Sequence, residues 1–177
     1  MSSRAVAWLV GAVVAIAAAV ILIPLFSQSS HGSGPAGLAG QPAPAIELTD
    51  DAGKPVSLAQ YRGSTVVVNL WATWCPPCRA EMPDLQRLAD AYRGRGLVVV
   101  GVDEGESAEH ARAFAKSLRI AYPIWIDDQQ RYGRAFVALG MPTTVIVGRD
   151  GNVVRGFDGA LTYNQMRAAV ADVVPAH

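Results

Sequence analysis

The two cysteines of the chain stand close together, between a strand-like run and a helix-like run. Cys75 and Cys78 are the only cysteines among 177 residues, and they follow the β-branched run 65–70 and open the amphipathic segment 76–92. A thiol in the first turn of a helix lies at the positive end of the helix dipole, which favours its thiolate and makes Cys75 the expected nucleophile. Cys78 follows one helical turn later, faces the same way and can resolve a mixed disulfide. The pattern therefore predicts redox chemistry on a strand-helix unit.

Two other interpretations of the cysteine pair are a structural disulfide and half of a zinc site. A bridge across so few residues closes too little chain to stabilise a domain much, and it is readily reduced. Zinc normally takes four protein ligands. The three histidines, His31, His110 and His177, fall in a linker, a helix-like segment and the chain terminus. We therefore expect no metal ligands.

The charge balance excludes several classes of partner. The chain has 15 basic and 15 acidic residues, and neither sign forms a long block. Nothing in this distribution indicates nucleic acid or a strongly acidic partner.

The N-terminus is an apolar run that contains no charged residue between positions 5 and 26, preceded by Arg4 in the segment 1–4. At 1.5 Å per residue this run is long enough to cross a bilayer core of about 30 Å. A cleaved signal peptide is the alternative, with a small-residue cleavage candidate at 37–39. The predictions are a cytoplasmic segment 1–4, a transmembrane anchor 5–26 and a flexible linker 27–43 rich in Gly, Ser, Pro and Ala.

Residues 44–177 form one domain-sized unit in which strand-like and helix-like segments alternate. The helical spacing of apolar residues in 76–92, between the apolar runs 65–70 and 97–102, indicates a right-handed β-α-β unit. Turn residues predict an N-terminal hairpin over 46–58, and Asp-Gly predicts a second one over 145–157. The remaining predicted elements are helices over 107–118, 130–139 and 162–174 and a strand over 122–126. The alternation predicts an α/β fold, a three-layer sandwich with a mixed sheet.

Several motifs resemble the TlpA/ResA-like branch of the thioredoxin superfamily, whose members are membrane-anchored extracytoplasmic thiol-disulfide oxidoreductases. VVVNLWATWCPPC, ending at Cys78, is similar to the active-site entry of that family, and the following Arg79-Ala80-Glu81-Met82-Pro83 matches as well. Gly140-Met141-Pro142-Thr143-Thr144 resembles its cis-proline loop. The segment 104–139 is long enough for the central helix-strand insertion of this branch. The resemblance covers essentially all of 44–177.

The resemblance implies a set of site residues around the cysteines. Cys75 is the exposed nucleophile and Cys78 the resolving thiol, and the redox-active pair needs no cofactor. A cis peptide bond before Pro142 would turn the Met141 backbone toward the site, where an extended substrate segment could pair with it. We expect Trp74 and the Pro76-Pro77 dipeptide to form the rim of the substrate site. The dipeptide also tunes the redox potential.

Glu81 stands three residues after Cys78, on the same face of the helix as the cysteine pair. In this branch an acidic residue at that place is implicated in handling the cysteine protons, and a carboxylate there could accept the proton of Cys78. The alternative is an ordinary solvated helix charge. Asn69 occupies the place of a buried Asp in thioredoxin itself, and because an amide cannot accept that proton, the task shifts to Glu81.

By resemblance, the chain is a reductant of disulfides in exported proteins, such as apocytochrome c cysteines during cytochrome maturation. Its electrons would come from a membrane thiol donor, and its catalytic domain would lie on the extracytoplasmic side of the cell membrane. One alternative is an oxidant that introduces disulfides by the same chemistry. Another is a module for metal handling or copper-site assembly that uses the thiols as soft ligands.

Overall fold

The computed structural model describes residues 35–174 of the chain. Within that range no helix is both long and apolar enough to cross a bilayer. The predicted cytoplasmic segment 1–4 and anchor 5–26 lie outside the described residues.

A seven-stranded mixed sheet organises the described residues, in the strand order β2-β1-β5-β4-β3-β6-β7. β3, β4 and β5 run parallel to one another, while β1, β2, β6 and β7 pair antiparallel. The hairpin predicted over 46–58 is confirmed as β1 and β2, in which Leu48 pairs with Val56. The strand bounds are β1 Leu48–Asp50, β2 Pro55–Val56, β3 Thr65–Trp71, β4 Leu97–Glu104, β5 Ile124–Asp127, β6 Thr143–Val147 and β7 Val153–Asp158.

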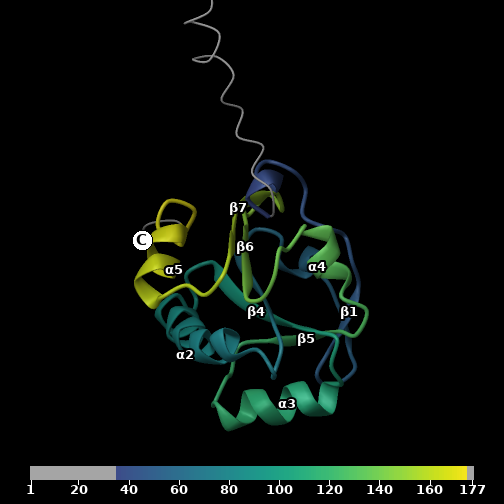
Figure 1. The fold of residues 1–177 in the computed structure, drawn as a ribbon. Coiled ribbons are helices and arrows are strands. Elements are labelled where there is room, and N and C mark those ends of the chain that lie inside the picture. Colours follow the sequence, from purple (N-terminus) through teal and green to yellow (C-terminus); the bar gives the residue numbers. More distant parts are fainter. Residues whose placement is uncertain (1–34, 175–177) are drawn as a thin grey trace, which may run out of the picture. The chain divides into compact units, whose positions relative to one another are not determined.

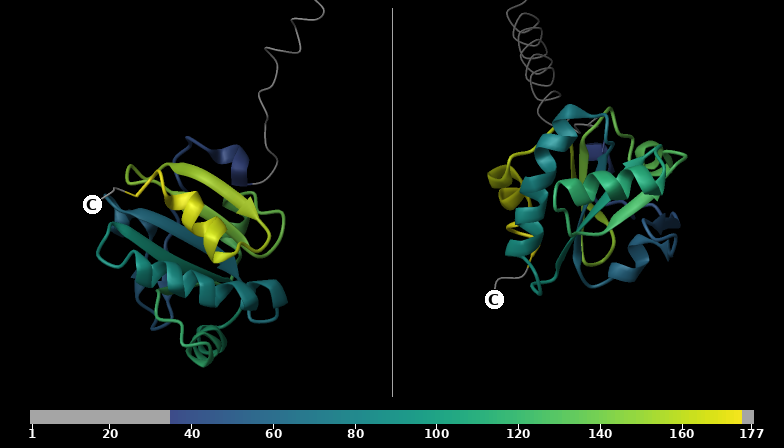
Figure 2. Two further views of the ribbon diagram at one scale, coloured as in Figure 1. Left: turned by 90° about the vertical axis from the view of Figure 1, so that its left-hand side faces the viewer. Right: turned by 90° about the horizontal axis from the view of Figure 1, so that it is seen from below.

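Helices cover both faces of this sheet (Figures 1 and 2). One face packs against α2 (Pro76–Ala91), α3 (Ala108–Ser117) and α5 (Tyr163–Val170), with α2 and α5 side by side. The other face packs against the short α4 (Arg131–Ala135) and the 3-10 helix η2 (Leu58–Tyr61). These layers confirm the predicted thioredoxin-like sandwich.

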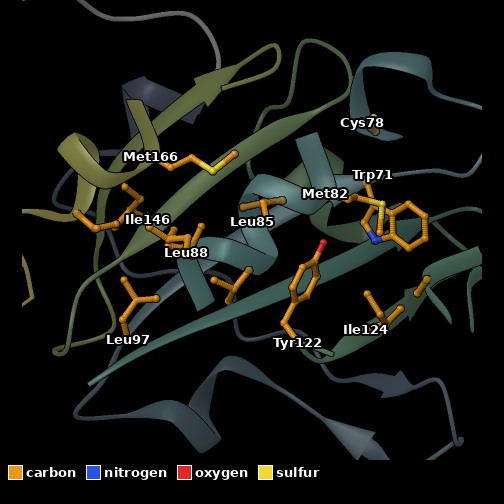
Figure 3. Packing of buried hydrophobic residues seen from close by; sticks show 14 of the residues in the cluster. Trp71, Cys78, Met82, Leu85, Leu88, Leu97, Tyr122, Ile124, Ile146 and Met166 are labelled. Atoms are coloured by element: carbon orange, nitrogen blue, oxygen red, sulfur yellow. The ribbon is translucent and has the colours of Figure 1, made fainter. Parts of the chain in front are cut away.

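The core between the sheet and α2 fixes where the cysteine pair lies. Met82, Leu85 and Leu88 project from α2 into this core and are fully buried, as their helical spacing predicts (Figure 3). Burying a side chain of this size contributes about 1.5–3 kcal/mol. Cys78 lies on the same side of α2 and is itself fully buried. The helix therefore cannot roll to expose Cys78 without opening the core.

The carboxyl ends of the parallel strands meet at one edge of the sheet, where ligand sites form in folds of this type. β3 ends at Trp71, and α2 starts after only a short connection at Pro76. β4 and β5 end beside it at Glu104 and Asp127, which are register partners. The cysteine pair and two carboxyl groups thus lie at the same edge.

The predicted linker 27–43 differs from the structure in its second half. Residues 35–38 form the 3-10 helix η1 (Pro35–Leu38), and Gly40 N–H donates to Val153 O over 2.8 Å. The edge strand β7 has free main-chain groups that this segment satisfies. Gly156 makes room for it, because a Cβ there would lie 2.5 Å from Pro35. The folded domain therefore includes residues 35–43, and the boundary predicted at residue 44 falls too late.

The segment after β5 also differs from its prediction. The helix expected over 130–139 is reduced to α4, Arg131–Ala135. Gln130, before it, and Val137, after it, adopt the left-handed conformation with φ of 53° and 54°. These two residues end the helical geometry that was expected over the whole segment.

Candidate active site

The first turn of α2 places Cys75 at the N-cap of the helix. Its Sγ accepts a hydrogen bond of 3.3 Å from the backbone N–H of Cys78. Pro76 and Pro77 occupy the first two helical positions, and proline has no N–H to donate. The Cys78 N–H is thus the one donor that the first three helical positions offer to the sulfur. The helix start stabilises a thiolate less than an ordinary helix N-terminus does.

Cys75 and Cys78 form a disulfide, so the structure represents the oxidised protein. Cys78 is fully buried, and Cys75 is only 3% exposed. The expectation of an exposed nucleophile is therefore wrong for this state, because the disulfide holds the Cys75 sulfur toward the buried Cys78. Access to Cys75 is through a neighbouring pocket.

That pocket has a volume of about 570 Å³, and Cys75 forms part of its wall. It brings together most of the residues predicted to contact substrate, namely Trp74, Pro76, Pro77 and Met141. The three large apolar side chains that are exposed among residues 35–174 all line it: Trp74 at 63%, Val137 at 48% and Leu139 at 67%. Such clustering marks an interaction site.

The sequence analysis missed a second wall of this pocket, which is built from residues within 130–141. Backbone hydrogen bonds fix this wall after the short helix: Val137 N–H donates to Arg134 O over 3.1 Å, and Ala138 N–H donates to Gly133 O over 2.9 Å. The signal in the sequence is the apolar pair Val137 and Leu139 beside the Met-Pro loop, which a continuous helix over 130–139 does not explain.

Pro142 is preceded by a cis peptide bond, as the family resemblance implied. Pro142 is buried, and its carbonyl accepts a 2.8 Å hydrogen bond from Gly159 N–H. It does not line the pocket, whereas its neighbour Met141 does. Met141 is therefore the residue of this loop that can contact a substrate.

Glu81, three residues after Cys78 on α2, is buried and is not a solvated helix charge. One carboxylate oxygen accepts a 3.3 Å hydrogen bond from Leu161 N–H, and the other has no partner among the described residues. Burial raises the pKa of Glu81 to about 7, although the Leu161 N–H and the side chains of Asn69 and Thr144 partly offset this. A carboxyl group with this pKa can accept and return a proton near neutral pH.

A second group of acids, absent from the sequence predictions, holds the loop that precedes Cys75. Glu106 accepts hydrogen bonds from the backbone N–H and the hydroxyl of Thr73, both at 2.6 Å. Its own N–H donates to Asp103 over 3.1 Å. Burial, together with the charge of Glu106, raises the pKa of Asp103 to about 8. Asp103 therefore favours its neutral form, which limits repulsion of the Glu106 carboxylate.

Glu104 is a further residue that the sequence analysis did not identify. It is 5% exposed and lines the same pocket as Cys75. Burial, and then the neighbouring Asp127, raise its pKa to about 7, while Gly133 and Arg134 partly offset the effect.

The residues present suit thiol-disulfide exchange. Across residues 35–174, no group of three or more His, Cys, Asp or Glu side chains is placed to hold a metal ion. The site combines a dithiol-disulfide pair, a buried carboxyl group near it and an apolar pocket beside the first sulfur. These parts provide a nucleophile, a proton acceptor and a binding surface.

Comparisons with known proteins agree with this geometry. The family model described as "AhpC/TSA family" matches residues 39–155. The thiol-disulfide oxidoreductase ResA of Geobacillus thermodenitrificans is 32% identical over 136 residues, which cover 77% of this chain and 78% of that protein. ResA of Bacillus subtilis is 32% identical over 123 residues, covering 70% and 69%. The crystal structure of a putative thiol:disulfide interchange protein DsbE from Chlorobium tepidum superposes with a TM-score of 0.71 at 26% identity, covering 76% of this chain and 96% of that one.

Proposed function

The chain belongs to the AhpC/TSA family and is a thiol-disulfide oxidoreductase, and from this premise we propose that it reduces disulfides of exported proteins at the outer face of the cell membrane. Its anchor would be the apolar run 5–26. Its clients would include apocytochrome c cysteines during cytochrome c maturation, and a membrane thiol donor would return it to the dithiol form. The similarity to ResA proteins and the apolar run support this proposal.

The observation that carries the proposal is the access route to Cys75. The sulfur is almost buried, and the pocket in front of it has an apolar rim of Trp74, Val137 and Leu139. A small thiol needs no such rim, whereas a protein segment gains binding energy by covering it. The client is therefore a polypeptide that places its own disulfide in the pocket.

The reaction proceeds in two exchange steps. The Cys75 thiolate attacks one sulfur of the client disulfide, forming a mixed disulfide, and the displaced client sulfur takes up a proton. Cys78 then passes its proton to Glu81 and attacks the Cys75 sulfur, which releases the second client thiol. The two electrons that reduce the client come from the Cys75-Cys78 dithiol, which ends as the disulfide seen in the structure.

The direction of the reaction follows from how well the protein stabilises its thiolate. Strong oxidants of this class stabilise the reduced form. Here Pro76 and Pro77 remove two N–H donors from the helix start, and Glu81 and Glu104 add negative charge near the sulfurs when they ionise. Both features disfavour the thiolate and support a reductant.

Two measurements on the full-length protein test the proposal. The reduction potential against glutathione should lie below about −200 mV, and a value near about −120 mV, that of a strong oxidant, would contradict a reductant. Cys78→Ser should accumulate mixed disulfides with exported cysteine-containing proteins, because the resolving thiol is lost. Failure to trap any exported protein, while Cys75 still reacts with small disulfides, would contradict the proposed clients.

A further inference from the structure

Glu104 occupies an unusual position for a carboxyl group, in the wall of a largely apolar pocket. It is the last residue of β4 and lines the pocket together with Cys75 and the exposed Trp74 and Leu139. Its side chain is almost buried, and its Oε1 has no hydrogen-bond partner among residues 35–174. A buried acceptor without a partner costs free energy, and a donor on a bound client would remove that cost.

The fold makes room for this carboxyl group at one residue of α4. A Cβ on Gly133 would lie 2.7 Å from Oε2 of Glu104, which is closer than real Cβ atoms approach. Glycine inside a helix is unfavourable compared with alanine, and Gly133 lacks the positive φ that would otherwise explain it. The glycine is therefore explained by the carboxyl group that it accommodates.

Among the described residues no charged group forms a salt bridge with Glu104, although Gly133 and Arg134 partly lower its pKa. Asp127, its register neighbour on β5, accepts a 2.7 Å hydrogen bond from Tyr132 N–H and has Arg131 at 3.6 Å. Arg134 also lines the pocket, but none of the salt bridges among the described residues joins it to Glu104. A positive group that enters the pocket would give Glu104 a salt-bridge partner and would offset the repulsion between Glu104 and Asp127.

We propose that Glu104 is a specificity-determining residue, which selects disulfide clients that carry a basic side chain next to the reacting cysteine. The inference rests on the proposed function, since it takes the pocket to be the place where a client segment binds. The apolar rim binds any such segment, and the carboxylate at the wall distinguishes among segments by charge.

The test uses three disulfide-bonded peptides that differ only in the residue after the reacting cysteine, which is Lys, Gln or Glu. Reduced full-length protein is mixed with each peptide, and the single-turnover rate of peptide reduction is measured over a range of peptide concentrations. The wild type should prefer the Lys peptide over the Gln peptide roughly tenfold, and the Glu peptide should be slowest. Glu104→Gln should bring the three rates close together.

Two further variants separate specificity from a structural effect. Gly133→Ala should also lose the preference for Lys, because its Cβ displaces the carboxyl group while alanine remains a good helix former. Glu109→Gln, an exposed acid on α3, should keep the preference. The rate of each variant with an uncharged small disulfide, 2-hydroxyethyl disulfide, serves as the reference for that variant, because loss of the Glu104 charge also changes the reactivity of the Cys75 thiolate for every disulfide.

The outcomes distinguish the inference from the proposed function. Equal wild-type rates for the three peptides would overturn the inference and leave the reductase intact. An equal loss of rate for all peptides in Glu104→Gln would also overturn it, since that result indicates a structural role. If the wild type reduces 2-hydroxyethyl disulfide but none of the peptides, the proposed action on polypeptides fails instead.

Discussion

The two walls of the active-site pocket are built in different ways. Trp74 and the first turn of α2 form one wall, which is held by a regular, capped helix packed on the core. Residues 130–141 form the other wall, which is a five-residue helix between two residues with positive φ. The first wall carries the reacting sulfur on a rigid element. The second carries apolar and charged side chains on an irregular segment, where sequence changes can alter recognition without moving the sulfur.

The largest expected difference between the walls comes from removing the nucleophile. Cys75→Ser should lower the rate of client reduction by more than about a thousandfold, because the hydroxyl cannot form the mixed disulfide. Leu139→Ser, on the other wall, should raise KM about tenfold or less and leave kcat unchanged, because it removes only binding surface. Steady-state reduction of a protein disulfide measures both. A fall in kcat for Leu139→Ser would show that the two walls are not separable.

The buried carboxyl group of Glu81, on the helix that forms the first wall, should control the pH dependence of the resolution step. Glu81 has a pKa of about 7, so below pH 7 it is protonated and cannot accept the Cys78 proton, while above pH 7 it can. The rate of release from the mixed disulfide should therefore rise with pH through about 7. Glu81→Gln should slow this step about a hundredfold at pH 8 and flatten the profile.

Rapid mixing followed by acid quenching measures release from the mixed disulfide directly. Glu109→Gln serves as the matched control, because it removes an exposed acid far along the chain from α2. A profile in Glu81→Gln that still rises through pH 7 would assign the proton to another group.

The same contrast explains what the sequence could predict. The sequence predicts three features closely: the strand 65–70, the helix that begins at Pro76, and the place of the cysteine pair between them. These features depend on hydrophobic periodicity and helix-start residues, which act locally. The left-handed conformations at Gln130 and Val137 could not be predicted, because neither residue type favours a positive φ. They depend on tertiary contacts. Those contacts also decide the rest of the site.

Glu104 and Glu106 show the limit for side chains. In the sequence each is an ordinary acid near the end of a strand. Only the folded sheet places Glu104 in the pocket wall and Glu106 within hydrogen-bond distance of Thr73. Glu81 could be found because the helical repeat relates it to Cys78 within one element. Pro35 likewise joins the domain by packing against Gly156 of β7, a long-range contact that the composition of the segment does not reveal.

The hydrogen bonds between Glu106 and Thr73, just before the first wall, should contribute measurably to stability. Glu106→Ala leaves both the N–H and the hydroxyl of Thr73 without their acceptor, which should lower the free energy of unfolding by about 1–3 kcal/mol. Urea denaturation of the oxidised protein measures this change. Glu109→Ala, an exposed acid on the neighbouring helix, should cost about 0.5 kcal/mol or less. Equal effects of the two variants would show that the hydrogen bonds to Thr73 contribute nothing net.

The smallest expected effect lies in the second wall, where Val137 holds a β-branched side chain at φ 54°. The left-handed conformation costs about 1–2 kcal/mol for such a residue, and asparagine tolerates it better. Val137→Asn should therefore raise the free energy of unfolding by about 1 kcal/mol. Leu139→Asn removes a similar exposed apolar side chain from the same rim, but Leu139 lacks a positive φ, so it should give no such gain. Both variants should weaken client binding alike, because each loses apolar surface. If Val137→Asn is no more stable than Leu139→Asn in denaturant titrations, the backbone of the second wall is not strained, and its irregular shape follows from its hydrogen bonds alone.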